Sequence, residues 1–443
     1  MITFARDHLN LVYTVKQPLR ISGMILAVLF LASWSTLQAT SSIEEFISKM
    51  PVKNVQVLEK ESFYSHIYEV MFEQPIDHNN PEKGSFYQRL YISHTGVDMP
   101  VVLVTEGYSA GYYYTSEPAA MLRCNQIIAE HRYFGKSVPD SVQWEYLDTW
   151  QSASDHHRIV EQFREFYTGK WITTGISKGG QSTMYHSFYY PDDVDVRIPY
   201  VAPLNKSIED RRIYSFLDEV GTRDCRRKIR RFQRHALRHQ EELLPAFREF
   251  SEKKGYTYSL VGGVETAFEF CVLEYSFAFW QWGYAACSEI PGRRATPEEI
   301  IVHMNRVAGF DYFADAFVIE YQPFFYQSYT ETGYYGYELE KFEHYLQHLE
   351  QRGFEFALPA DAEVSFDDSI QLALDAYIRN EAENFIFIYG EYDTWSATAV
   401  ELNGNTNSRI FYKEKGSHRT RVRNMPQEQQ DEIFGVLTGF LQD

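Results

Sequence analysis

Residues 171–180 read Trp-Ile-Thr-Thr-Gly-Ile-Ser-Lys-Gly-Gly, and this stretch decides the fold. Its second half contains a G-x-S-x-G motif centred on Ser177, between a strand pattern at 171–175 and a helix pattern at 181–188. A sharp turn between a strand and a helix needs glycines, because Cβ atoms would clash where the backbone folds back, and it lifts the serine hydroxyl above the sheet edge. We therefore predict that Ser177 is a nucleophile. The alternative is a tight glycine-rich turn with a capping serine.

Strand and helix patterns alternate around this motif. Residues 101–104 (Val-Val-Leu-Val) are continuously apolar, as expected for a buried parallel strand. Residues 126–131 form a further strand pattern, and residues 147–168 form a helical one. Further strands are expected at 55–58, 66–72 and 86–94. Alternation of this kind predicts an α/β fold with a mostly parallel central sheet.

The pattern changes after Pro203 and becomes almost entirely helical. The helices expected in this region are 208–219, 225–253, 264–279, 296–307 and 337–350. Strand patterns return at 384–390 and 409–412, and a final helix is expected at 426–442. The prediction is one sheet domain, residues 40–205 and 381–443, interrupted by a helical insertion at 206–380.

A nucleophilic serine needs a base, and the base needs a carboxylate that orients it. Proteins with this kind of turn carry the three residues in the order Ser, acid, His, each after a strand. Asp393 follows the strand pattern at 384–390 and is our predicted acid, with Glu391 as the second choice. His418 follows the strand at 409–412 and is the only histidine after residue 348. We predict a catalytic triad of Ser177, Asp393 and His418.

Acyl transfer also needs two backbone N–H groups that bind the developing negative charge. One is expected from Lys178, the residue after the nucleophile. The second is expected from Tyr108 or Gly107, in the loop that follows the strand at 101–104.

Composition and charge narrow the function classes. The chain has 443 residues, 44% apolar and 23% charged, which is typical of a globular protein. Its net charge is 42 − 61 = −19, which argues against a nucleic-acid partner and against docking on anionic lipid. The cysteines and histidines lack zinc-site spacing, so we expect no metal, and a serine triad requires no cofactor.

The N-terminus resembles a signal peptide over residues 1–39. A nine-residue apolar run at 24–32 follows basic residues and precedes Leu37-Gln38-Ala39, and the run is too short to span a membrane. We therefore expect a secreted or periplasmic protein with no membrane span after cleavage. Disulfides persist in such compartments, but four cysteines permit three pairings. They are Cys124, Cys225, Cys271 and Cys287, and a bridge among the last three is expected.

The sequence also resembles a known family across nearly all of the chain after residue 39. The shared motifs are Phe-Glu-Gln-Pro-Ile-Asp-His at 72–78, Gln-Arg-Leu-Tyr at 88–91, Glu-Gly at 106–107, Glu-His-Arg-Tyr-Phe-Gly-Lys-Ser-Val-Pro at 130–139, Gln151, Asp155, the turn at Ser177, Tyr-Gln-Ser-Tyr-Thr-Glu-Thr-Gly-Tyr-Tyr at 326–335, Asp-Thr-Trp at 393–395 and Gly-Ser-His at 416–418. These motifs resemble those of the S37 serine peptidases, which release tripeptides from free N-termini. They are also similar to the related S28 family of prolyl carboxypeptidase and dipeptidyl peptidase II.

This resemblance implies an α/β-hydrolase whose helical insertion forms a cap domain over the triad. It also implies that Trp395 and Gln181 face the pocket for the residue that precedes the cut bond. An enzyme that recognises a free amino terminus must pair a buried ammonium group with a carboxylate. Glu106 and Glu331 are our expected partners, because both lie in matched motifs; the alternative for each is a structural ion pair.

We therefore predict an aminopeptidase that acts on peptide substrates with a free N-terminus. Two other functions remain compatible with the sequence: an esterase or lipase on the same fold, and an inactive homologue that binds peptides.

Overall fold

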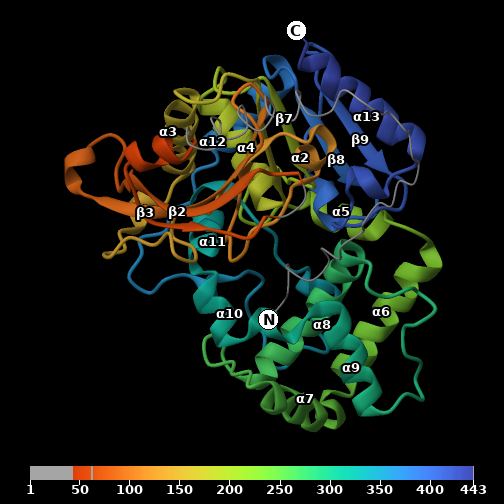
Figure 1. Ribbon diagram of the computed structural model, residues 1–443. Helices are drawn as coiled ribbons and strands as arrows, with labels where there is room; N and C mark the ends of the chain where they lie inside the picture. The colour runs from red at the N-terminus through yellow and green to blue at the C-terminus, as the bar shows by residue number, and fades with distance from the viewer. Residues whose placement is uncertain (1–42, 61–62, 443) are drawn as a thin grey trace.

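A computed structural model describes residues 43–60 and 63–442 (Figure 1). The expected signal segment, residues 1–39, lies outside the described residues. Figure 1 shows a strand-containing part surrounded by helices and, below it in this view, a second part made of helices. Within the described residues, no helix combines the length and apolar character needed to cross a membrane.

Nine strands in the described part of the chain form one sheet, in the order β1-β2-β3-β5-β4-β6-β7-β8-β9. The strands are β1 Val52–Val57, β2 His66–Pro75, β3 Ser85–His94, β4 Val101–Thr105, β5 Asn125–Ala129, β6 Trp171–Ile176, β7 Val196–Tyr200, β8 Ile386–Gly390 and β9 Arg409–Lys413. The three neighbouring pairs β1–β2, β2–β3 and β3–β5 are antiparallel. All neighbouring pairs from β5–β4 to β8–β9 are parallel. The expected mostly parallel sheet is thus confirmed.

Helices cover both faces of this sheet. Alternate residues of β4 point to opposite faces, and the apolar residues on each face pack against helices. Val101 and Leu103 pack with α3, whereas Val102 and Val104 belong to the core cluster that contains α13. The helices of this part are α2 Glu117–Leu122, α3 Thr149–Arg164, α4 Lys178–Tyr189, α12 Ser369–Asn380 and α13 Gln427–Phe440. Burial on both faces explains why β4 reads as a continuous apolar run.

The chain between strands β7 and β8 contains the helical segment. Its helices are α5 Arg212–Glu219, α6 Arg223–Arg238, α7 Gln240–Lys254, α8 Val264–Trp282, α9 Pro297–Ala308, α10 Asp315–Glu320 and α11 Gln322–Gln327. They share one core of their own around the apolar helix α8.

A disulfide joins Cys225 to Cys287, one of the pairings left open by the sequence, while Cys124 and Cys271 are buried free thiols.

Three features of this segment differ from expectation. The helix expected at 225–253 is divided at His239 into α6 and α7. The prediction of a helix at 337–350 is wrong, because within this range only Leu339–Lys341 form a short 3-10 helix. The backbone N–H groups of residues 347–349 instead donate to the buried carboxylate of Glu269, at 2.7 to 3.1 Å. In addition, α12 lies inside the predicted insertion but packs beside α4 in a cluster with β8.

Candidate active site

Ser177 lies in the sharp turn between β6 and α4. Its backbone has φ 58° and ψ −120°, a region that residues other than glycine rarely adopt and that marks stored strain. The glycines on either side are required sterically. A Cβ atom on Gly175 would lie 2.2 Å from the carbonyl oxygen of Gly179, and one on Gly179 would lie 2.6 Å from that of Thr105. The turn predicted from the G-x-S-x-G motif is thus confirmed.

Asp393 and His418 form a buried pair in the loops that follow β8 and β9. His418 Nδ1 lies 2.7 Å from Asp393 Oδ2, and the two side chains are 3% and 0% exposed. A carboxylate can only accept here, so Nδ1 carries the proton and Nε2 is left as the basic nitrogen. Asp393 Oδ1 accepts the Trp395 N–H, which fixes the carboxylate from the other side. Burial raises the pKa of Asp393, and the charge and hydrogen bond of His418 oppose that rise.

The second-choice acid, Glu391, does not take part in this pair. Its carboxylate accepts the backbone N–H of Lys415 at 2.7 Å on the exposed side of the loop. The structure therefore places Asp393, and not Glu391, against the imidazole.

The loop after β4 packs directly on the turn that contains Ser177. A Cβ atom on Gly107 would lie 2.6 Å from both the backbone nitrogen of Gly179 and Cβ of Lys178. Lys178 is the first residue of α4, where backbone N–H groups have no partner within the helix. The close approach at Gly107 thus brings the loop that contains Tyr108 beside the N-terminus of α4.

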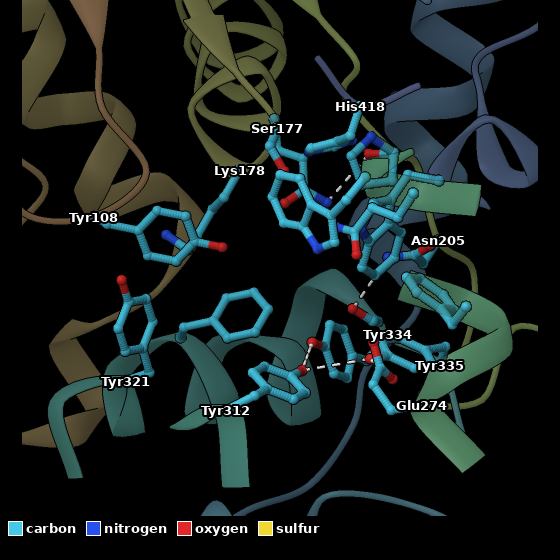
Figure 2. Close-up of a pocket in the computed structure, with 18 of the residues that line it drawn as sticks. Tyr108, Ser177, Lys178, Asn205, Glu274, Tyr312, Tyr321, Tyr334, Tyr335 and His418 are labelled. Atoms are coloured by element: carbon cyan, nitrogen blue, oxygen red, sulfur yellow. Dashed lines mark hydrogen bonds between the residues drawn. The ribbon is translucent and has the colours of Figure 1, made fainter. Parts of the chain in front are cut away.

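A cavity lies between the sheet part and the helical segment. Ser177 and His418 both line it, as do the predicted residues Lys178, Gln181 and Trp395 (Figure 2). Tyr108, Pro203 and Asn205 also line it from outside the helical segment, and the remaining wall is mostly aromatic and comes from that segment. Those aromatic residues are Phe277, Trp282, Tyr312, Phe317, Tyr321, Phe324, Tyr334 and Tyr335. A mostly aromatic lining with a few polar groups is typical of a small-molecule or peptide site.

One carboxylate in this wall, Glu274 on α8, was not predicted. Figure 2 shows it across the cavity from Ser177 and His418. Its Oε2 accepts hydrogen bonds from the hydroxyls of Tyr335 and Tyr337, each at 2.8 Å. Burial raises the pKa of Glu274 to about 8, although both hydrogen bonds act to lower it. Such a group in a pocket is a strong candidate for ligand recognition.

The two glutamates expected to bind an amine do not line this cavity. Glu106 accepts a hydrogen bond from Tyr114 at 2.6 Å, and burial raises its pKa to about 7. Glu331 accepts the backbone N–H of Thr149 at 2.7 Å, at the first residue of α3, where a negative charge stabilises a helix. Burial also raises the pKa of Glu331 to about 7. Both contacts are structural ones within the protein.

Lys178 has a second role besides its backbone N–H. Its ammonium nitrogen lies 3.1 Å from His131 Nε2 and above the rings of Tyr108 and Phe134. His131 Nδ1 lies 2.8 Å from the carbonyl oxygen of Arg132, so this nitrogen is the donor and Nε2 accepts from lysine. Burial holds the pKa of Lys178 well below its ordinary value. The Lys178 side chain therefore connects the turn at Ser177 with residues 130–135 through its contact with His131.

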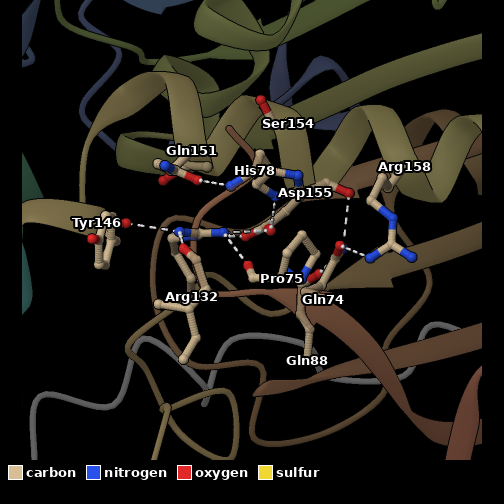
Figure 3. Close-up of polar contacts among 12 residues, drawn as sticks. Gln74, Pro75, His78, Gln88, Arg132, Tyr146, Gln151, Ser154, Asp155 and Arg158 are labelled. Carbon is tan, nitrogen blue, oxygen red and sulfur yellow. Dashed lines mark hydrogen bonds and ion pairs between the residues drawn. The ribbon is translucent and has the colours of Figure 1, made fainter. Parts of the chain in front are cut away.

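Several of the motifs that carry the family resemblance meet in one buried network (Figure 3). Arg132 donates to both oxygens of Asp155, at 2.7 Å each, and to the carbonyl oxygens of residues 75, 76 and 146. His78 Nε2 lies 2.8 Å from Asp155 Oδ1, and the Gln151 side chain donates to Asp77. Burial would raise the pKa of Asp155, but the charge and hydrogen bonds of Arg132 hold it well below its usual range. These motifs stabilise the scaffold and do not line the cavity.

Within residues 43–60 and 63–442, no group of three or more histidine, cysteine or acidic side chains is arranged to hold a metal ion. A mostly parallel sheet with helices on both faces, Ser177 in the sharp turn after β6 and the Asp393–His418 pair after β8 and β9 are the features of the α/β-hydrolase fold class.

Comparison with known proteins gives the family. Residues 42–433 match the PS-10 peptidase S37 family, and the chain belongs to that family and is a serine peptidase. A relative named prolyl tri/tetrapeptidyl aminopeptidase, from Streptomyces mobaraensis, is 30% identical over 389 residues, which cover 86% of this chain and 81% of the relative.

Solved structures are similar at a lower level. VinJ has a TM-score of 0.40 and 10% identity, over 88% of this chain and 99% of VinJ. Proline iminopeptidase from Mycobacterium smegmatis has a TM-score of 0.37 and 13% identity, over 84% of this chain and 99% of that enzyme.

Proposed function

We propose that this protein is an exported serine aminopeptidase that releases short peptides, tripeptides or dipeptides, from the free N-termini of its substrates. The observation that carries the proposal is the placement of Glu274 in the same cavity as Ser177 and His418. A peptide bound with its amine at Glu274 and a carbonyl at Ser177 would be cut at a fixed distance from its N-terminus. The relative's name, which specifies tri- and tetrapeptide release, supports this kind of activity.

The proposed mechanism forms an acyl-enzyme on Ser177. The serine oxygen attacks the scissile carbonyl while His418 Nε2 takes its proton and then gives it to the leaving amine. Asp393 keeps the imidazole in the tautomer that this requires and stabilises its charged form. The negative oxygen is bound by the N–H groups of Lys178 and of Tyr108 or Gly107. Water then attacks the ester, with His418 again as the base.

Recognition of the free N-terminus is assigned to Glu274. An ammonium group taken into a mostly aromatic cavity loses its hydration and needs a carboxylate partner. The two tyrosine hydroxyls already hold Glu274 Oε2, which leaves Oε1 for the substrate. Trp395 and Gln181 line the same cavity and are assigned to the residue that precedes the cut bond. The helical segment, which supplies Glu274 and most of the aromatic wall, acts as the cap.

Export is inferred from the signal-like sequence at 1–39. The Cys225–Cys287 disulfide supports it, because such bonds persist in oxidising compartments.

The test compares matched peptides with free and acetylated N-termini on the wild type and on Glu274→Gln. The wild type should cut only the free-amine peptide, and Ser177→Ala should cut neither and should lose fluorophosphonate labelling. Glu274→Gln should raise KM for the free-amine peptide about 10- to 100-fold, the effect of losing one charged hydrogen bond. Equal cleavage of the acetylated peptide by the wild type would contradict an aminopeptidase, and cleavage of simple esters alone would identify an esterase.

A further inference from the structure

A second cavity lies inside the helical segment. It is bounded by α5, α6, α8 and the chain at 336–342. Its deep wall is apolar and buried, formed by Ile229, Leu273, Phe277, Trp280 and Phe342. Gln233 and Ser276 add an amide and a hydroxyl to the same wall. An apolar wall with a few polar groups has the character of a small-molecule site.

This cavity shares a wall with the catalytic one. Phe277 lines both cavities. Tyr337 lines the second cavity, and its hydroxyl donates at 2.8 Å to Glu274, which lines the first. A ligand against Tyr337 would therefore touch one of the two side chains that hold Glu274.

Most of the charges around the second cavity compensate one another. Lys341 lies 2.9 Å from Asp218 and also pairs with Glu338. Arg230 lies 3.3 Å from the same Asp218. These side chains are 29 to 46% exposed, so they form the rim of the cavity and not its interior.

Arg226 is the cation of this cavity that lacks a carboxylate. Its Nη1 donates to the carbonyl oxygens of residues 219, 220 and 221, at 2.7 to 2.8 Å. Its Nε is buried and has no hydrogen-bond partner. Within the described residues, no acidic side chain lies within ion-pair distance of Arg226. A buried guanidinium N–H without an acceptor is unfavourable, and an incoming carboxylate would satisfy it with a charge-assisted hydrogen bond.

We propose that the second cavity binds a small amphipathic monocarboxylate, with its apolar body against Phe277 and Trp280 and its carboxylate at Arg226, and that its occupancy is sensed at Glu274 through Tyr337. Two sources share this chemistry: the C-terminal end of a short peptide, which peptide hydrolysis generates, and a free aliphatic or aromatic acid. The binding does not depend on the proposed aminopeptidase activity, whereas the link to Glu274 does.

The binding test uses the full protein with Ser177 blocked by a fluorophosphonate, so that the catalytic cavity is occupied. Isothermal titration with 3-phenylpropionate, octanoate and N-acetyl-Leu-Phe should show one saturable site, and 3-phenylpropanamide, which lacks the charge, should bind at least tenfold more weakly. Tighter binding of the acetylated dipeptide would identify a peptide C-terminus as the source, and tighter binding of octanoate would identify a free acid. Absence of saturable binding, or equal binding of the amide, would overturn the proposal.

Two variants locate the site. Arg226→Met should weaken binding at least tenfold, whereas Arg227→Met should change it less than twofold, because the exposed Arg227 pairs with Asp224 outside the cavity. Leu217→Trp, at a half-buried wall position, should fill the cavity and abolish binding while thermal unfolding stays cooperative. Equal losses in the two arginine variants would place the ligand elsewhere and refute the assignment.

The link to Glu274 is tested with the unblocked enzyme. A saturating ligand should change KM for a free-amine peptide at least twofold, with kcat little altered. Tyr337→Phe, compared with its own ligand-free KM and at a ligand concentration that saturates the variant, should show no such change. An unchanged KM with the ligand bound would overturn the link. Loss of all peptidase activity in the wild type would instead refute the proposed function and leave the binding result standing.

Discussion

His418 donates its Nδ1 proton to Oδ2 of Asp393 over 2.7 Å, and the Trp395 N–H holds the other carboxylate oxygen. This pair is shielded from solvent, so the imidazole has one tautomer available and presents Nε2 to the cavity. The orientation is therefore imposed by the loops that follow β8 and β9, before any substrate is bound.

Asp393→Asn should leave the fold intact and lower kcat by roughly 10⁴-fold, because an amide can reverse the tautomer of His418. Glu391→Gln, in the same loop but bonded to the Lys415 backbone, is the matched control and should change kcat less than twofold. The measurement is kcat on a free-amine peptide, with circular dichroism to verify folding. A large loss in the Glu391 variant with a small one in the Asp393 variant would reverse the assignment of the acid.

Glu274 should make peptide affinity depend on pH. In the protein without substrate, the carboxyl group of Glu274 is protonated below its pKa of about 8. Binding an ammonium group therefore requires Glu274 to lose this proton. A peptide amine itself loses its proton near pH 8. The affinity of an uncleaved peptide for Ser177→Ala should thus rise from pH 6, reach a maximum near pH 8 and then fall. Titration calorimetry in buffers of different ionisation enthalpy should detect proton release at pH 6.5.

The control for this pH dependence is Glu274→Gln in the same Ser177→Ala background. It should bind more weakly and lose the rise between pH 6 and 8, because glutamine does not titrate. A rise that persists in this variant would assign the pH dependence to another group.

Gly107→Ala tests the contact between the loop after β4 and the turn at Ser177. The added methyl would lie 2.6 Å from the Gly179 nitrogen, so the loop must move away from the N-terminus of α4. Under the proposal that this loop supplies one of the N–H groups for the developing charge, its displacement should lower kcat about 10²-fold, and KM should change much less. Gly111→Ala, where an added Cβ meets nothing within 4 Å, should be neutral. A Gly107 variant with normal kcat would separate this loop from catalysis.

The local features of the site were predictable because short spacings determine them. The G-x-S-x-G turn requires glycines because an added Cβ atom would clash there. Asp393 and His418 each follow a strand that the hydrophobic pattern shows clearly. Parallel strands end at the same edge of a sheet, so residues after them converge there. The antiparallel β1-β2-β3 part and the order of strands depend on long-range pairing, which spacing along the chain does not specify.

Glu274 could not be assigned a role because no motif surrounds it. The available signal was an ionisable residue within the strongly apolar helix α8, which indicates a buried and partnered carboxylate but not the cavity it faces.

The prediction of a helix at 337–350 failed for a related reason. Its helical pattern competes with a tertiary contact, the buried Glu269, which lies about 80 residues away and captures three backbone N–H groups.

The Cys225–Cys287 disulfide closes a loop of 62 residues in the helical segment. Replacing both cysteines with serine should lower the free energy of unfolding by about 2–4 kcal/mol, chiefly because the unfolded chain gains conformational freedom. Urea denaturation would measure this change.

The buried pair of Arg132 and Asp155 should contribute to stability and not to activity. Arg132→Met leaves the Asp155 charge buried without its main partner and should cost about 3–5 kcal/mol of unfolding free energy. Arg164→Met, an exposed arginine at the end of the same helix as Asp155, should cost less than about 1 kcal/mol.

The pair should also set part of the acid stability. The pKa of Asp155 is lowered on folding, so its contribution is present above the unfolded pKa near 4 and is lost as the pH falls further. Urea midpoints of the wild type should therefore fall between pH 5 and 3 more steeply than those of a double variant, Arg132→Met with Asp155→Leu. Parallel curves for the two proteins would mean that other carboxylates control unfolding in acid.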